Sequence, residues 1–298
     1  MKFRAVITDS IHIRELLNVV TIFSRINKNL IINIQPAKVI IQIETEVEAS
    51  QCLWCEIDAS DHGRSSSSNQ GYFAEYVMDG VDKEHNQIYL AVVAAHLVRA
   101  LSYVRNNAVD YLKFKLVKTD VACLAVEISG TSHNDSDIMT PKVQHDIPVT
   151  IAPRSEWRNF QLPFDTAYDL TMLLPTVKSL RGLLDKKKNI SPSVTIYATL
   201  AGELSLVVET DIVTVASHYR GLQCSRARPP DEEESETEPL TEAACKVDSK
   251  KLATLFESVN FCDMKMIANV KNEHLFNVKF EIKDNVFINF ILPAVDFE

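Results

Sequence analysis

One pattern occurs four times along this chain: a β-like run leads into a helix whose apolar residues fall at i, i+3, i+4 and i+7. In the first copy, the run at 3–7 precedes Ile13, Leu16, Leu17 and Val20. The copies lie roughly 75–85 residues apart, and such a period indicates a repeat architecture. The β-like runs are 3–7, 88–93, 168–173 and 245–247, and the predicted helical segments are 12–28, 96–106, 177–188 and 250–260.

About three alternating β-rich runs follow each helix, so the repeating unit is one strand, one helix and then three antiparallel strands. Segments 39–46 and 204–211 match each other at a shift of 165 residues, which pairs the four units into two similar domains. We therefore predict an α+β fold. Its N-terminal domain spans 1–152, a connecting loop spans 153–167, and its C-terminal domain spans 168–298.

Composition excludes several classes of protein. Glycine is scarce, with 7 residues in 298, so there is no glycine-rich loop to bring main-chain N–H groups around a phosphate. This argues against a nucleotide-hydrolysing or dinucleotide-binding enzyme. No apolar run approaches the ~18–20 residues of a membrane span, and we expect neither a secretory signal nor membrane contact. Six cysteines lack the spacing of a disulfide framework, which favours a reducing nuclear or cytoplasmic compartment.

Positive charge gathers in the helical segments although the whole chain has a net charge of −9. These segments hold twelve Lys or Arg and three Asp or Glu, a net of +9 that leaves −18 for the rest. Ordinary solvated helix faces mix both signs, so the bias favours helices that face a polyanion through its phosphates, independently of base sequence. The candidate residues are Arg14, Arg25, Lys28, Arg99, Arg105, Lys178, Arg181, Lys188, Lys250 and Lys251.

Several groups of residues look like chemical sites but lack what the chemistry needs. Cys52 and Cys55 form a CxxC motif on a predicted strand, where residues three apart point to opposite faces, and no second pair of ligands is suitably spaced. The remaining candidates have simpler explanations. His133, Asp135 and Asp137 fit the tip of a polar loop. His145 and Asp146 precede a strand, and no nucleophile is partnered with them. We expect no catalytic residue, metal or cofactor.

Two segments have the composition of solvated loops, the Ser-rich stretch 63–69 and the acidic stretch 225–242. Phosphorylation at Ser235 or Thr237 is an alternative role for the acidic stretch. The connecting loop is different, because it contains four large apolar or ring residues. They either pack onto their own domain or line a docking groove for partner peptides. They are Trp157, Phe160, Pro163 and Phe164.

Short motifs, in a fixed order over nearly the whole chain, carry a family resemblance. They include Leu53-Trp54-Cys55-Glu56-Ile57, His96-Leu97-Val98-Arg99-Ala100-Leu101, His145-Asp146-Ile147-Pro148-Val149 and Phe290-Ile291-Leu292-Pro293-Ala294. In these motifs the chain resembles the Hus-type subunit of the nine-one-one DNA-damage checkpoint clamp, a relative of the replicative sliding clamp. Segments 63–69 and 225–242 depart from the family and inherit no role from it.

The resemblance implies a sliding-clamp fold, with helices on the inner face and antiparallel sheets outside. It also implies a nuclear heterotrimer, with a cytoplasmic pool allowed, in which two other clamp subunits complete a ring around double-stranded DNA. An ATP-dependent clamp loader would place the ring, and repair enzymes and checkpoint mediators would dock on it. The implied subunit-interface edge strands are 143–151 and 212–219. Their interface residues are Val143, Ile147, Val149, Ile151, Ile212, Val213, Val215 and His218. The implied peptide groove adds Leu292 and Pro293 to the four connector residues.

Three alternatives remain at this stage. The chain could be a metal-dependent nuclease acting on damaged DNA ends, which would need a carboxylate cluster. It could be a replicative-type clamp that closes as a homotrimer. It could also be a β-rich interaction module without a DNA role.

Overall fold

The computed structural model describes residues 1–44, 51–60, 71–118, 120–131, 141–163, 167–226, 240–261, 264–282 and 286–295. The chain divides into two compact units. Unit 1 consists mainly of Met1–Glu44 and Trp54–Gln161, and most of unit 2 follows Leu162. The expectations for His133, Asp135, Asp137, Phe164, Ser235 and Thr237, and for the stretch 63–69, lie outside the described residues, as does most of the acidic stretch.

Unit 1 contains the first two repeats, and four strands follow its first helix where the sequence predicts about three. Its elements are β1 (Lys2–Ile7), α1 (Ser10–Ile26), β2 (Asn29–Ile34), β3 (Lys38–Ile43), β4 (Cys52–Asp58), β5 (Glu75–Asp79), β6 (Ile88–Val93), α2 (Ala94–Ala100), η1 (Leu101–Arg105), β7 (Val109–Lys118), β8 (Ala122–Gly130), β9 (Lys142–Pro148), β10 (Thr150–Ile151) and the 3₁₀ helix η2 (Arg154–Phe160).

Unit 2 repeats the alternation of strands and helices. Its elements are β11 (Leu170–Leu173), α3 (Val177–Lys187), β12 (Ser193–Thr199), β13 (Leu204–Glu209), β14 (Thr214–Tyr219), β15 (Cys224–Arg226), β16 (Glu242–Asp248), α4 (Ser249–Ser258), β17 (Lys265–Lys271), β18 (Leu275–Ile282) and β19 (Val286–Pro293). The four strand–helix pairs β1–α1, β6–α2, β11–α3 and β16–α4 confirm the recurrence predicted from sequence.

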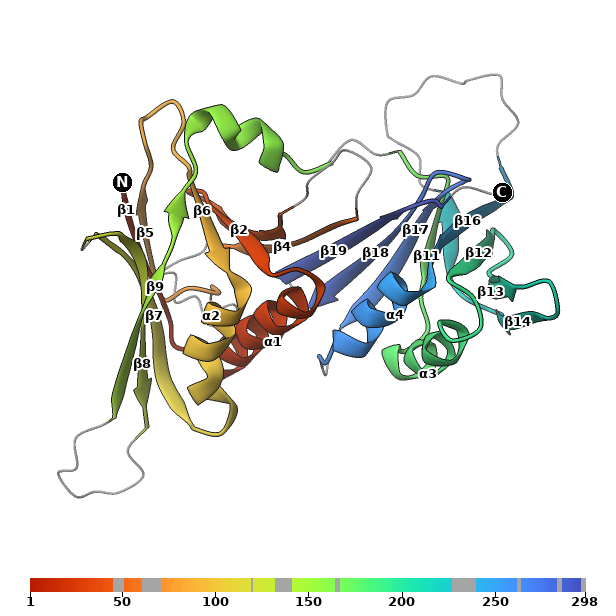
Figure 1. Ribbon diagram of the computed structural model, residues 1–298, viewed down its shortest axis with the longest axis horizontal. Helices are drawn as coiled ribbons and strands as arrows, with labels where there is room; N and C mark the ends of the chain where they lie inside the picture. Colours follow the sequence, from red (N-terminus) through yellow and green to blue (C-terminus); the bar gives the residue numbers. More distant parts are fainter. Residues whose placement is uncertain are drawn as a thin grey trace. The chain divides into compact units, whose positions relative to one another are not determined.

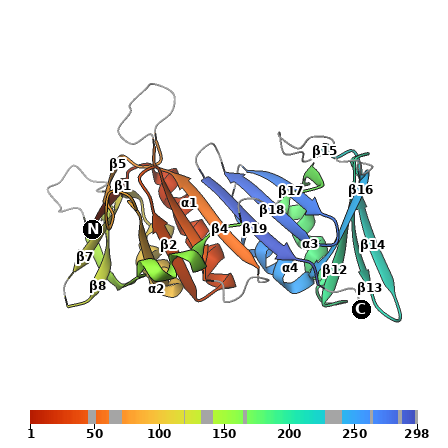
Figure 2. The same cartoon turned by 90° about the horizontal axis from the view of Figure 1, so that it is seen from above.

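Antiparallel sheets form the framework of each unit. In unit 1, strands lie in the orders β5-β1-β7-β8-β9 and β10-β6-β2-β3-β4. In unit 2, they lie in the orders β14-β13-β12-β16 and β19-β18-β17-β11-β15. Helix α1 lies beside α2, and α3 beside α4 (Figures 1 and 2). The predicted α+β architecture is confirmed.

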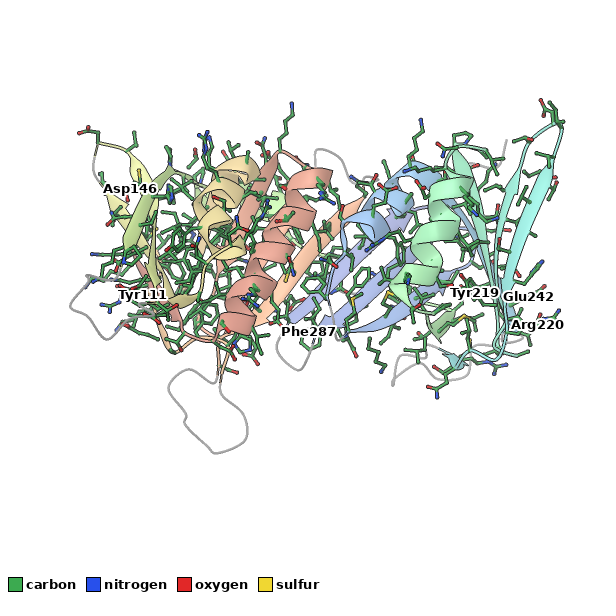
Figure 3. All side chains as sticks on the ribbon, turned by 90° about the horizontal axis from the view of Figure 1, so that it is seen from below. Tyr111, Asp146, Tyr219, Arg220, Glu242 and Phe287 are labelled. Carbon is green, nitrogen blue, oxygen red and sulfur yellow. The ribbon has the colours of Figure 1, made fainter. Side chains whose placement is uncertain are left out.

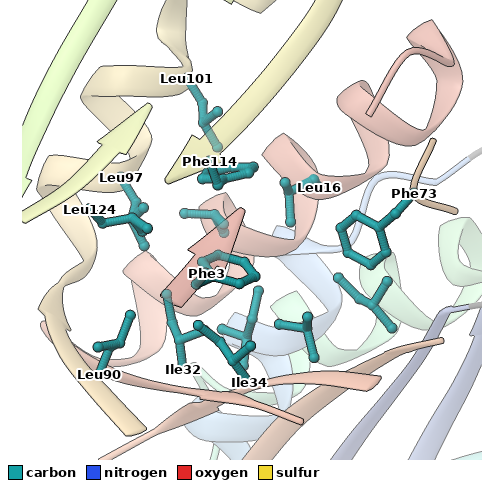
Figure 4. A pocket seen from close by; sticks show the side chains of 14 residues that line it. Phe3, Leu16, Ile32, Ile34, Phe73, Leu90, Leu97, Leu101, Phe114 and Leu124 are labelled. Carbon is teal, nitrogen blue, oxygen red and sulfur yellow. The ribbon is translucent and has the colours of Figure 1, made fainter. Parts of the chain in front are cut away.

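Apolar periodicity coincides with a side-chain cap at the start of α1 and of α4, whereas α2 and α3 begin without one. The Asp9 carboxylate accepts a hydrogen bond from the Ile11 amide (2.7 Å) at the start of α1, and Asp248 accepts one from the Lys251 amide (2.9 Å) at the start of α4. The apolar stripe of α1 then packs between the sheets. Figure 4 shows this core, where Phe3 and Leu16 meet Leu97 from α2 and Phe114 from β7 around a residual cavity of about 50 Å³.

Two predicted elements differ from the structure. The helix expected at 96–106 is α-helical only to Ala100, and the Ser102 hydroxyl donates to the Arg99 oxygen (2.7 Å) where the chain tightens into a 3₁₀ turn. The single strand expected at 143–151 divides after Pro148, which has no N–H for the ladder. The Val149 amide donates to the Ala122 oxygen, and Ile151 then pairs with Leu90 in the other sheet.

The connecting segment is also not wholly a loop. Arg154–Phe160 forms η2, which belongs to unit 1. Across the described ranges, no helix is both long and apolar enough to cross a membrane.

Candidate nucleic-acid interface and subunit edges

Helix α1 exposes positive charge and no carboxylate. Arg14 and Arg25 are exposed on it, and Lys28 is exposed just after its end. Its one acidic residue, Glu15, is only 7% exposed. The outward charge of α1 is therefore entirely positive, because the acid lies on the buried side of the helix. Figure 3 shows the side chains that project from α1 and from its neighbour α2.

The second helical segment of unit 1 continues this surface. Arg99 on α2 and Arg105 at the end of η1 are both exposed, whereas Leu97 and Leu101 are buried in the core. The segment Ala94–Arg105 contains no Asp or Glu. Unit 1 thus brings its five sequence-predicted basic residues to α1, to the residues just after it and to α2–η1, and α1 contacts both α2 and η1.

In unit 2, α4 opens with two exposed lysines, Lys250 and Lys251, and has no acid in its first turn. The N-terminal end of a helix carries partial positive charge, so cations there cost about 0.3–1 kcal/mol each at an exposed site. The Asp248 carboxylate that caps this end offsets part of the cost, and an external anion would offset more of it. Lys178, near the start of α3, is likewise exposed.

Three basic residues in or just after α3 have partners within unit 2: Arg181, Lys187 and Lys188. The Lys188 ammonium pairs with Asp185 (2.8 Å) and with Glu257 of α4. These hydrogen bonds raise the pKa of Lys188, and the bond to Asp185 contributes most. Lys187 is only 2% exposed and donates to the Val215 oxygen (2.8 Å). Desolvation lowers the pKa of Lys187.

Arg181 is half-buried, and its guanidinium lies at the C-terminal end of α4. It donates to the main-chain oxygens of Phe256 (2.9 Å) and Val259 (2.5 Å). Of the predicted polyanion-facing set in unit 2, the structure therefore leaves Lys178, Lys250 and Lys251 extended into solvent. Sequence periodicity does not reveal most of these partners, because all of them except Asp185 come from elements far along the chain.

Both segments predicted as subunit edges supply the last strand of a sheet. β9 is the end strand beside β8, and β14 is the end strand beside β13. On β9, Val143 is half-buried and Ile147 is 3% exposed. Val149 is buried at the junction after β9, and Ile151 belongs to β10.

The residues predicted for the β14 edge differ in their surroundings. Ile212 is 96% exposed and Val213 is 45% exposed, and both precede the strand, in the turn after β13. Val215 is half-buried, and His218 is exposed, with its Nδ1 2.7 Å from the Ser205 hydroxyl. Figure 3 labels Tyr219, the last residue of β14, and Arg220 after it.

The first half of the connector packs onto its own unit. The Trp157 and Phe160 rings lie 5.1 Å and 5.7 Å from the Tyr89 ring, and Trp157 Nε1 donates to the Ala152 oxygen (3.1 Å). At the start of η2, Arg154 pairs with Asp82 (3.0 Å). The sequence left open whether Trp157 and Phe160 pack onto their own domain or line a docking groove, and the structure shows both of them packed on unit 1.

The remaining groove candidates are placed as follows. Pro163 is exposed, Leu292 is 1% exposed on β19, and Pro293 is half-buried. Within unit 1, Phe160 also borders an open groove of about 520 Å³ whose wall includes Val93, Val121 and Val149.

The described residues do not assemble a reactive centre. Burial raises the pKa of Cys55 and of Cys52, which disfavours the thiolate that metal binding and redox chemistry need. Within the described ranges, no three His, Cys, Asp or Glu residues are grouped so that they could hold a metal ion.

A family model described as Hus1-like protein matches residues 1–296. The Drosophila melanogaster protein named Checkpoint protein Hus1-like is 29% identical over 99% of this chain and 99% of its own length. Checkpoint protein HUS1 from Homo sapiens is also 29% identical, over 99% of this chain and 100% of its own length.

Solved structures with a similar fold are sliding clamps. Proliferating Cellular Nuclear Antigen from Entamoeba histolytica superposes with a TM-score of 0.69 at 13% identity, covering 99% of both chains. PCNA from Thermococcus kodakaraensis superposes with a TM-score of 0.67 at 14% identity, covering 98% of this chain and 100% of the other. The chain has the sliding-clamp fold.

Proposed function

Because the chain belongs to the Hus1-like protein family, we propose that it is a non-enzymatic subunit of a heterotrimeric sliding clamp that encircles double-stranded DNA at sites of damage. In this role it scaffolds checkpoint kinase signalling and the docking of repair enzymes. Two other clamp subunits complete the ring, an ATP-dependent clamp loader places it, and the complex works in the nucleus.

The observation that carries the DNA role is the charge on the exposed side of the helices. Arg14, Arg25 and Arg99 extend into solvent from unit 1, and the acid of α1 is buried. Lys250 and Lys251 stand at a helix end that disfavours cations. Such groups bind phosphates without reading bases, which suits a ring that must slide.

The open edges support assembly with other chains. Among the residues that the structure describes, β9 and β14 each have a strand neighbour on one side only, so their outer main-chain groups can extend a sheet. The groove beside Phe160 and the exposed Pro163 support peptide docking near the connector. These surfaces correspond to the subunit and effector contacts of the proposed scaffold.

Charge reversal tests the DNA role. The triple variant R14E/R25E/R99E, assembled with the other two clamp subunits, should slide off linear DNA and be lost from closed circular DNA faster than wild type as salt rises. The matched control reverses Lys83, Lys115 and Lys118, which are exposed but lie outside the helices. Equal retention of both variants on closed circles would refute the proposed DNA contact.

The alternatives give different results in the same preparations. Metal-dependent cleavage of DNA ends, abolished by a point change in this chain, would establish a nuclease. A closed trimer of the isolated chain in light scattering would establish a replicative-type clamp. Salt-independent behaviour of the complex toward DNA would favour an interaction module without a DNA role.

A further inference from the structure

Unit 2 contains an open groove beside the junction of β11 with α3. The segment 173–178 forms one side of it, and residues 259–261 and 264–266, around the α4–β17 connection, form the other. Its volume is about 630 Å³, which lies within the ~300–1,000 Å³ of typical ligand pockets. The groove offers apolar contact on both sides. Its half-buried apolar side chains are Leu173, Leu174, Pro175, Val177, Phe261 and Met264.

Two lysines and an arginine line the same groove, and the part of its lining that the structure describes contains no carboxylate. Lys178 is exposed and has no partner among the described residues. Lys265 lies 3.7 Å from the Glu281 carboxylate, but Lys279 holds that carboxylate at 2.9 Å. Because one carboxylate is shared by two lysines, Lys265 can take a further anion.

Arg181 brings a third cation to the groove in a fixed orientation. Its Nε and Nη2 donate to the carbonyls of Phe256 (2.9 Å) and Val259 (2.5 Å), so the plane of the guanidinium is held by the end of α4. Nη1 carries further N–H groups, for which the described part of the chain provides no acceptor. A guanidinium that the protein already orients loses little freedom when it binds an anion.

Three cations around one groove suit a phosphate group better than a carboxylate. A phosphorylated serine or threonine carries a charge of about −1.5 to −2 and three acceptor oxygens, whereas a carboxylate carries one charge and two oxygens. Guanidinium also matches the geometry of phosphate oxygens. The apolar side chains beside the cations favour a ligand that carries an apolar group next to its phosphate.

A phosphopeptide meets both requirements, and duplex DNA meets only the first. The DNA backbone presents phosphates without apolar side chains beside them, so Val177, Phe261 and Met264 would stay in contact with water. In a phosphopeptide, the residue next to the phosphorylated one supplies the apolar group. Basic clusters with arginine are a recurring means of recognising such peptides.

We propose that this groove binds a phosphoserine or phosphothreonine peptide with a neighbouring apolar residue. The phosphate accepts hydrogen bonds from Lys178, Lys265 and the Nη1 of Arg181, and the apolar residue packs between Val177 and Met264. The inference deepens the proposed scaffold role and rests on it for the source of the ligand, because kinase signalling produces such peptides. Binding itself uses only this groove, so it can be measured without the other clamp subunits.

A peptide library with one fixed phosphothreonine, offered to the isolated full-length chain, is the first probe. Selection should enrich an apolar residue beside the phosphothreonine. The enriched peptide, carrying a fluorophore, then gives a dissociation constant by fluorescence anisotropy. Its unphosphorylated form should bind at least about tenfold more weakly, because charged hydrogen bonds to the phosphate are lost.

Variants of the chain separate the phosphate contacts from the apolar ones. K178A and K265A should each weaken binding about three- to tenfold, because each removes one contact to the phosphate. M264S should also weaken binding but leave the preference for the phosphorylated form intact. The matched controls are K186A, an exposed lysine of α3 outside the groove, and I190S, an exposed isoleucine just after α3. Arg181 stays unchanged in this series because it also caps α4.

Three results would overturn the proposal: no enriched sequence, equal affinity for the phosphorylated and unphosphorylated peptides, or binding by K178A and K265A that matches K186A. Wild-type affinity in M264S, together with displacement of the peptide by an equal concentration of a short DNA duplex, would assign the groove to DNA and also overturn it. Failure of the chain to join the other two clamp subunits overturns the proposed heterotrimer and leaves the measured peptide binding intact.

Discussion

Arg181 of α3 donates from Nε to the main-chain oxygen of Phe256, 2.9 Å away in the last turn of α4. The last carbonyls of a helix have no intrahelical donor, and a cation there also favours the helix dipole. On α1, the equivalent position of the repeat holds Leu17, which is buried in the core. Unit 2 thus joins its two helices by a charged cap where unit 1 uses apolar packing.

Replacing Arg181 with leucine should destabilise unit 2 by about 1.5–3 kcal/mol, because hydrogen bonds from a charged donor are lost and two carbonyls lose their partner. Urea unfolding measures the change. R181K should fall between wild type and R181L, since an ammonium cannot reproduce the forked contact. K178L, on the exposed side of α3, is the control, and an equal effect there would contradict the capping role.

Lys250 gives a prediction in which stability and DNA retention move in opposite directions. K250E places a carboxylate in the first turn of α4 and should stabilise the chain by about 0.3–1 kcal/mol. The same variant should weaken retention of the assembled ring on closed circular DNA at moderate salt. Thermal unfolding and a retention assay measure the two effects. Loss of stability would show that the helix end does not disfavour Lys250.

Trp157 should control the attachment of η2. W157A removes both the packing on Tyr89 and the hydrogen bond to the Ala152 oxygen, so the segment should detach more often. Trypsin cleavage after the exposed Arg158 should then be about tenfold faster, if roughly 1.4 kcal/mol of local stability is lost. W157F keeps an aromatic ring and should show a smaller increase. Equal cleavage rates in all three proteins would indicate that Trp157 does not hold η2.

Glu127 on β8 should make stability depend on acidity. A hydrogen bond from Tyr111, with a second from Lys113, lowers the pKa of Glu127 below its ordinary value of 4.5. A lowered pKa in the folded state contributes stability that is present above the unfolded-state value and is lost as pH falls through the folded-state value. Unfolding free energies at pH 7 and about pH 3 should therefore differ less in E127Q than in wild type.

The control for this pH dependence is E84Q, an exposed glutamate in the β5–β6 connection. On acidification, E84Q should lose as much unfolding free energy as the wild type does. If the unfolding free energy of E127Q falls with pH as steeply as that of wild type, Glu127 is not a source of the acid sensitivity.

Much of the fold was predictable because it is local. The apolar spacing of Ile13, Leu16 and Val20 determines which side of α1 is buried, and alternation does the same for the strands. Failures occurred where one residue changed the local hydrogen bonding. Ser102 bonds to the Arg99 oxygen where α2 ends, and Pro148 divides a run that otherwise reads as one strand.

The sequence by itself determined the repeated strand–helix units, the family and the excess of basic residues on the helices, because these depend on spacing and composition. Only the tertiary structure decided which cations remain available. Lys250 extends into solvent, whereas Arg181 caps a helix that lies 75 positions further along the chain and Lys187 holds an edge strand. The physical reason is that a carbonyl or carboxylate brought close by folding satisfies a buried cation, and such proximity has no signature in local periodicity.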